Sequence, residues 1–211
     1  HRDLHSFPTR RSSDQGEGLT PQEIDFVVCT HGHADHIGNN NLFPQATFVV
    51  SQDIAQGDIY LPHDFSEASY PLAEEIEVIA TPGHSGQDVS VIVRAAEGVT
   101  AIVGDLFERE EDLQDETLWR ATSQFPELQI ANRRRILEIA DSIVPGHGDK
   151  FASGKAGSPS LLTEISSLRP NNTRKHYRAV LFDLDGLIVA TEPLHFRAFQ
   201  ELVADRGCTL P

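Results

Sequence analysis

A dense cluster of metal-ligand side chains follows a short apolar run in the first quarter of the chain. The run, residues 25–30, is rich in β-branched residues, which favours a buried strand. Directly after it come four potential ligands within six residues: His31, His33, Asp35 and His36. Imidazole and carboxylate are the donors that borderline divalent ions prefer. The chain therefore needs a fold that presents the end of this strand at a metal site.

Three later residues can complete such a site. His84 follows a predicted strand at 75–80, and Asp105 closes another at 99–103. His147 lies in the sequence Pro-Gly-His-Gly. Strand ends can gather at one edge of layered sheets, where rigid scaffolds present chemistry. His31 and His33 can converge on one ion, while Asp35 and His36 turn toward a second, adjacent ion. The pattern therefore predicts two ions.

The remaining periodicity indicates an α/β layered domain. Further strands are predicted at 47–50 and 88–93, and a helix at 127–141 begins beside Pro126. A mixed order of strands and helices is typical of layered α/β folds. The residues expected on the buried face of the helix and just beyond it are Leu128, Ala131, Ile136, Ile139, Ala140 and Ile143.

Charge, cysteine count and hydropathy limit the partners and the compartment that are expected for this chain. The net charge of −15 argues against a broad nucleic-acid footprint but not against a small, metal-centred nuclease site. Two cysteines, Cys29 and Cys208, are too few for a disulfide framework, which favours a reducing compartment, the cytosol or nucleus. The sequence has no apolar run long enough to span a membrane, so no membrane association is expected.

The His-x-His-x-Asp-His signature, followed by a later His, Asp and His in order, resembles the metallo-β-lactamase superfamily. The likeness covers about residues 16–151 and implies an αββα sandwich. It implies a dinuclear site, most simply two zinc ions, with iron or manganese as alternatives. By resemblance, one ion is held by His31, His33 and His84, and the other by Asp35, His36 and His147, with Asp105 bridging both. Members carry strands before the signature for which this chain has no room, so we expect an incomplete sandwich with an open sheet edge.

The implied activity is hydrolysis by a water that two ions activate. Asp35 is expected to orient or deprotonate that water. The nearest likeness within the superfamily implies phosphodiester cleavage in RNA, to which Arg133, Arg134 and Arg135 could add phosphate contacts, although a solvated helix face explains such a run more simply. A glyoxalase II-like thioesterase acting on a small molecule and a non-catalytic metal-binding fragment remain as alternatives. A homodimer is compatible with either enzyme.

The ends of the chain differ from this core. Residues 1–15 are patternless and predicted to be a non-native tail, and residues 152–175 form a predicted linker. Residues 176–211 resemble the start of a haloacid dehalogenase-like phosphatase, in which Asp183 would be the nucleophile and Asp185 the acid/base, both binding Mg²⁺. A strand ending in a polar turn is the simpler alternative. The later motifs of that family do not fit before residue 211, so no phosphatase activity is expected.

Overall fold

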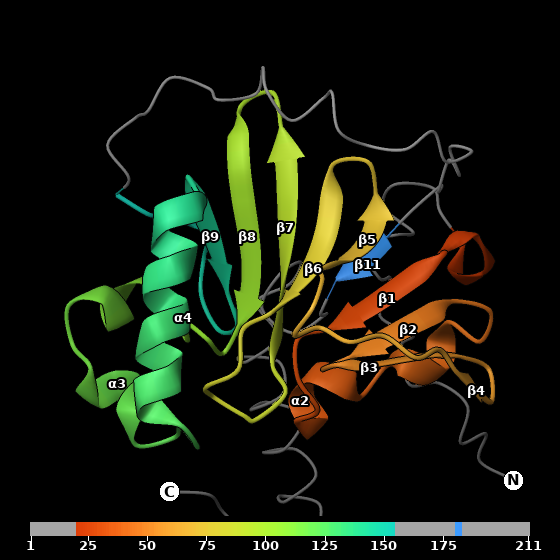
Figure 1. Cartoon of the computed structure of the whole chain (residues 1–211), viewed down its shortest axis with the longest axis horizontal. Helices are drawn as coiled ribbons and strands as arrows, with labels where there is room; N and C mark the ends of the chain where they lie inside the picture. Colours follow the sequence, from red (N-terminus) through yellow and green to blue (C-terminus); the bar gives the residue numbers. More distant parts are fainter. Residues whose placement is uncertain (1–19, 155–179, 183–211) are drawn as a thin grey trace, which may run out of the picture.

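Two β-sheets packed face to face form the centre of the molecule (Figure 1). The structure is a computed structural model, and it describes residues 20–154 and 180–182, to which the structural statements below apply. The first sheet has the strand order β11-β1-β2-β3-β4. Its strands are β1 (Phe26–Cys29), β2 (Thr47–Val50), β3 (Asp53–Gln56), β4 (Ile59–Tyr60) and β11 (Val180–Phe182).

The second sheet has the order β10-β9-β8-β7-β6-β5. Its pairs are antiparallel except for the parallel pair β8–β9. Its strands are β5 (Tyr70–Ala73), β6 (Ile76–Ala80), β7 (Val89–Ala95), β8 (Gly98–Gly104), β9 (Ser142–Pro145) and β10 (Phe151–Ala152). The helices are α2 (Ala34–Ile37), α3 (Thr117–Arg120), α4 (Pro126–Ile139) and the 3-10 turns η1 (Pro21–Glu23), η2 (Asn40–Leu42) and η3 (Glu110–Leu113).

Alternation along the strands divides the core into layers. Val89 and Val91 of β7 belong to the cluster between the sheets, together with Val28 of β1. Ile92 points to the opposite face, where it packs in a second cluster with Ile136 of α4. A third cluster lies on the outer face of the first sheet, under η2. The expected αββα sandwich is therefore confirmed.

The long strands lie where the alternating pattern predicts them, but the short ones and one helix face differ. β3, β4, β5, β9 and β10 were not predicted. The helix ends at Ile139, and Ile143 belongs to β9 rather than following the helical spacing. Leu128 is 44 % exposed and Ala131 is also exposed. The buried face of α4 is instead mainly polar, because it consists of Gln129, Asn132, Arg133 and Ile136.

The sheet edge beside β1 is not open as expected. Residues 180–182 form β11, which pairs with β1 in parallel register from Phe26 opposite Val180 to Val28 opposite Phe182. This strand comes from the segment that resembles a phosphatase start. Asp183, Asp185, the predicted linker beyond residue 154 and the predicted tail lie outside the described residues.

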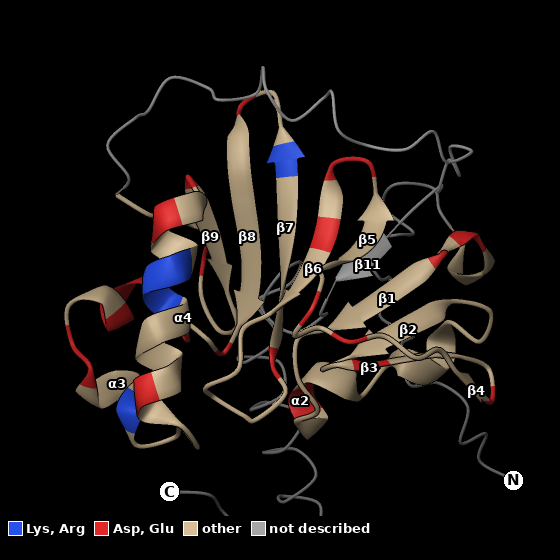
Figure 2. Ribbon diagram, in the orientation of Figure 1, with Lys and Arg blue, Asp and Glu red and all other residues tan. Residues whose placement is uncertain are grey.

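Charge is distributed unevenly over the molecule. Acidic residues occur in both sheets and their loops, whereas the few basic residues lie mainly on α3, α4 and β7 (Figure 2). None of the helices within the described residues has the length and apolar character to cross a membrane.

Candidate metal centre

The predicted ligands meet at one end of the two sheets. The end of β1 leads into α2, whose N-cap is His33, and the loops after β6 and β8 reach the same end (Figure 1). Gly104 closes β8 with a φ of 51°, a left-handed conformation that glycine adopts without strain. A Cβ at this position would also overlap the side chain of Thr30. This tight turn brings Asp105 beside the end of β1.

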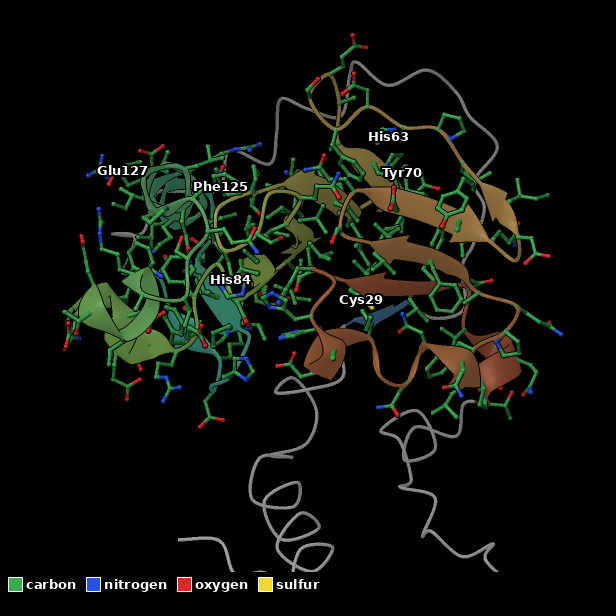
Figure 3. All side chains as sticks on the ribbon, turned by 90° about the horizontal axis from the view of Figure 1, so that it is seen from below. Cys29, His63, Tyr70, His84, Phe125 and Glu127 are labelled. Carbon is green, nitrogen blue, oxygen red and sulfur yellow. The ribbon has the colours of Figure 1, made fainter. Side chains whose placement is uncertain are left out.

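One group of ligands consists of His31, His33, His84 and Asp105, with one donor atom from each within 4.8 Å of the others. His33 Nδ1 lies 2.9 Å from His31 Nε2 and 3.1 Å from His84 Nε2. His31, His84 and Asp105 are buried, while His33 is exposed. In the view onto this end, His84 lies in the middle of the molecule (Figure 3). These residues come from three separate loops.

A second group consists of Asp35, His36 and His147, again with donor atoms within 4.8 Å. Asp35 Oδ2 lies 3.5 Å from His36 Nε2 and 3.8 Å from His147 Nε2. The carboxylate of Asp35 is 49 % exposed, whereas His36 is buried. Asp35 is therefore the most exposed ligand candidate of this group.

Asp105 lies between the two groups, with one oxygen turned to each. Its Oδ2 is 3.5 Å from His31 Nε2 and 3.3 Å from His84 Nε2. Its Oδ1 is 3.4 Å from His36 Nε2 and 3.3 Å from His147 Nε2. A single carboxylate thus faces a pair of histidines from each group. All seven residues predicted from the sequence are brought together.

Burial sets the protonation states of the centre. It lowers the pKa of His31 to about 3 and also lowers the pKa of His84, so both rings are neutral at pH 7 and each has a nitrogen lone pair. Burial alone would raise the pKa of Asp105, but hydrogen bonds from His147 and His36 hold it well below its usual value. The hydrogen bond to Asp105 raises the pKa of His147 in turn.

The donor set fits divalent metal ions. A neutral imidazole has one N–H and one lone pair, yet His33 Nδ1 faces ring nitrogens of two other histidines at hydrogen-bonding distance. Convergence of three ring nitrogens and a carboxylate is the ligand chemistry of a tetrahedral zinc ion. The second group has the same imidazole and carboxylate chemistry. The residues therefore form a candidate His/Asp metal centre with two adjacent positions.

The sequence prediction missed Glu108. This residue forms a third possible ligand group with Asp105 and His147, and its Oε2 lies 3.9 Å from His147 Nε2. Burial raises the pKa of its carboxyl group. The signal in the sequence was an acidic residue three positions after Asp105, in the same loop.

Arg133 does not have the role that the arginine run suggested. Its guanidinium is buried, lies 3.9 Å from the Phe107 ring centroid, and donates hydrogen bonds to the carbonyl oxygens of Leu106 and Asp112. It therefore supports the loop after β8 and does not face solvent as a phosphate contact.

The loop that carries His84 is held by a buried carboxylate. Asp88 Oδ2 accepts hydrogen bonds from the backbone N–H groups of Gly83 at 3.0 Å and Ser85 at 2.6 Å. The Ser85 hydroxyl donates to the other oxygen of the same carboxylate. His84 therefore lies in a fixed turn before any ion binds.

Comparisons with known proteins bear on the family and the fold of this chain. The family model for the metallo-beta-lactamase superfamily matches residues 7–66. Metallo-beta-lactamase domain-containing protein 1 from Xenopus laevis is 44 % identical over 147 residues, which is 68 % of this chain and 62 % of that protein. The chain belongs to the metallo-β-lactamase superfamily. The Homo sapiens protein of the same name is 48 % identical over 140 residues, 64 % of this chain and 52 % of that protein.

Within the superfamily, the chain spans roughly half to three fifths of the length of these curated relatives. Solved structures share its fold at lower identity. A probable metal-dependent hydrolase from Staphylococcus aureus matches with a TM-score of 0.51 and 19 % identity, over 66 % of this chain and 62 % of that one. These structural likenesses support the fold alone.

Proposed function

We propose that this chain is the metal-binding part of a hydrolase that holds two zinc ions and cleaves phosphodiester bonds in RNA. One observation carries the hydrolase proposal: Asp105 turns one oxygen toward His31 and His84 and the other toward His36 and His147. A carboxylate so placed suits two ions that share it. Two bound zinc ions would supply a water with a pKa near 7 and stabilise the developing oxyanion.

The chain's own residues have distinct tasks in this proposal. His31 and His84 are neutral and present lone pairs, while buried Asp105 retains its negative charge between the two positions. Asp35 is half-exposed at the rim of the second group. Its carboxylate can accept a proton from an attacking water that lies between it and the substrate.

The phosphodiester proposal rests on the resemblance described above and on the chemistry of paired metal sites. Two adjacent cations suit phosphodiester cleavage because they stabilise both the attacking and the leaving oxygen. The net charge of −15 limits how much of a polyanion the chain can bind, and acidic residues are spread over the ribbon (Figure 2). We therefore propose a short RNA segment as substrate, contacted at few phosphates, so that cleavage depends only weakly on salt.

A lactone or thioester substrate is the competing proposal. An N-acyl homoserine lactonase from Bacillus thuringiensis is 23 % identical over 141 residues. The same metal chemistry can hydrolyse an acyl ester, a thioester or a phosphodiester, so the substrate must be determined by assay.

The test compares three substrates under identical conditions. The zinc-loaded chain is incubated with a short single-stranded RNA, an N-acyl homoserine lactone and a glutathione thioester, and initial rates are measured. His33→Ala is the control for contaminating activity, because it removes one ligand from the exposed side of the site. The proposal predicts RNA cleavage that disappears in the variant. Faster turnover of the lactone or thioester would overturn the phosphodiester proposal, and two bound ions without any turnover would favour a non-catalytic metal-binding chain.

A further inference from the structure

The buried face of α4 is unusual because all the buried residues in the first two turns of this helix are polar. Gln129 is fully buried, Asn132 is 9 % exposed and Arg133 is 6 % exposed. Buried polar groups destabilise a fold unless they are hydrogen-bonded. All three side chains donate hydrogen bonds to backbone carbonyl oxygens of the two loops that carry His84 and Asp105.

Gln129 contacts the Asp105 loop directly. Its Nε2 donates hydrogen bonds to the carbonyl oxygens of Asp105 and Leu106, both at 3.1 Å. An amide side chain with two donors on one nitrogen can bridge two successive carbonyls. One amide therefore fixes the backbone of Asp105, the residue whose carboxylate faces four histidines of the two ligand groups.

The same residue also meets the His84 loop. A Cβ on Gly83 would overlap the backbone of Gln129, so α4 approaches this loop closely only because residue 83 is glycine. The N–H of Phe125 donates to the carbonyl of Gly83 at 2.9 Å, and the N–H of Gln124 donates to that of His84 at 3.0 Å. Gln129 thus lies at the point where both ligand loops touch α4.

Neighbouring side chains of α4 extend this arrangement along each loop. Asn132 Nδ2 donates to the carbonyl oxygen of Pro82 at 2.6 Å, two residues before His84. Arg133 donates to the carbonyl oxygen of Leu106 at 2.9 Å, one residue after Asp105. None of these side chains belongs to the candidate ligand groups.

We infer that α4 positions His84 and Asp105 for metal binding, with Gln129 as the residue that fixes both loops relative to each other. This inference rests on the proposed zinc site. Residues that hydrogen-bond to metal ligands set the orientation of those ligands, and loss of such a residue typically weakens metal affinity about 10- to 100-fold. Gln129 holds the backbone of Asp105, which faces both ligand groups, so Gln129 acts on both ions. Asn132 holds the backbone of Pro82 near His84, which belongs to one group, so Asn132 acts on one ion.

The experiment measures zinc affinity by competition with a chromogenic chelator. Gln129→Met keeps the length of the side chain but removes both donors. Asn132→Ala removes the donor to Pro82, and exposed Arg134→Ala on the same helix is the matched control. Urea unfolding of the metal-free proteins identifies conditions in which each variant is fully folded. Cobalt-substituted samples then report ligand geometry through their visible absorption.

The expected result is a loss of affinity of about 10- to 100-fold at both sites in Gln129→Met and at one site in Asn132→Ala, with altered cobalt spectra. Arg134→Ala should bind both ions as the unmodified chain does. A merely structural role would lower stability and leave the affinities and spectra of folded variants unchanged, which would overturn the inference. If Gln129→Met does not fold, Asn132→Ala decides alone, and unchanged affinity at both sites overturns the inference.

The unmodified chain separates this outcome from the proposed function. If it does not bind two ions, the proposed zinc site fails and the inference fails with it. If it binds two ions but hydrolyses none of the three substrates, only the proposed activity fails. Positioning by α4 is then still decided by the affinities of the variants.

Discussion

Replacement of Asp105 by asparagine should weaken both metal positions at once. Each oxygen of this carboxylate lies 3.3 to 3.5 Å from ring nitrogens of two histidines, one pair in each group. The asparagine amide would keep the shape of the side chain but would lose the negative charge and one of the two acceptor oxygens. The side chain of Asp105 is almost fully buried, so water cannot easily replace the lost oxygen.

The expected magnitude follows from the number of donors. Structural zinc sites bind with about 10 to 16 kcal/mol shared among about four ligands, or about 3 kcal/mol for each. A loss of about 3 kcal/mol corresponds to a roughly 100-fold rise in Kd. Asp105→Asn should therefore raise the Kd for zinc about 100-fold at both positions, whereas loss of a ligand such as His84 should affect one.

Chelator competition and elemental analysis measure this directly. The control is Glu111→Gln, which removes an exposed carboxylate from the same connection between β8 and α4 without touching the site. Dissociation constants of Asp105→Asn within about threefold of the unmodified chain at both positions would refute the bridging arrangement. Weakening at one position only would show that Asp105 serves a single ion.

Three further predictions test the rest of the centre. Asp35→Asn at saturating zinc should lower kcat by about 10²- to 10⁴-fold, and full turnover would exclude Asp35 as the proton acceptor. Gly146→Ala would place a Cβ on Asp105 Oδ1, so its zinc affinity should fall by at least about tenfold, and unchanged affinity in the same chelator assay would contradict this. The pKa of His31 is lowered to about 3, so the folded metal-free chain binds fewer protons than the unfolded chain between about pH 6.5 and 3. Its free energy of unfolding should fall as pH falls through this window, opposed in part by His147, whose raised pKa stabilises the fold below about pH 6.5. Urea unfolding across this range should show the decline, and His31→Gln should make it shallower.

The sequence predicted the proximity of the ligands because six of them follow predicted strands. His147 is the exception, because it follows the unpredicted β9 and was assigned from the sequence Pro-Gly-His-Gly and its place after the other ligands. Phe26–Cys29 is a continuous apolar run that is buried along its whole length, and Gly98–Gly104, the strand before Asp105, is buried over its second half, so both runs can be recognised without a structure. The short strands gave no such signal. Asp53–Gln56 buries only Ile54, and Tyr70–Ala73 contains a proline, which disfavours a strand prediction.

The face of α4 could not be predicted from apolar spacing. The pattern assumes that a helix buries its hydrophobic residues against a sheet. The first turns of α4 lie instead against loops whose carbonyl groups are outside the strand pairing, so Gln129 and Asn132 are buried and Leu128 is exposed. Glu108 was missed for a related reason, because its nearness to His147 depends on the path of a loop.

His36 and His147 belong to the same ligand group, although they lie far apart in the sequence. An ion gripped by both would close a loop that contains every strand from β2 to β9. Cross-links around loops of about 100 residues stabilise a fold by about 4 to 5 kcal/mol in the chain-entropy description. Bound zinc would then act as a reversible cross-link, and the metal-free chain would be more susceptible to proteolysis.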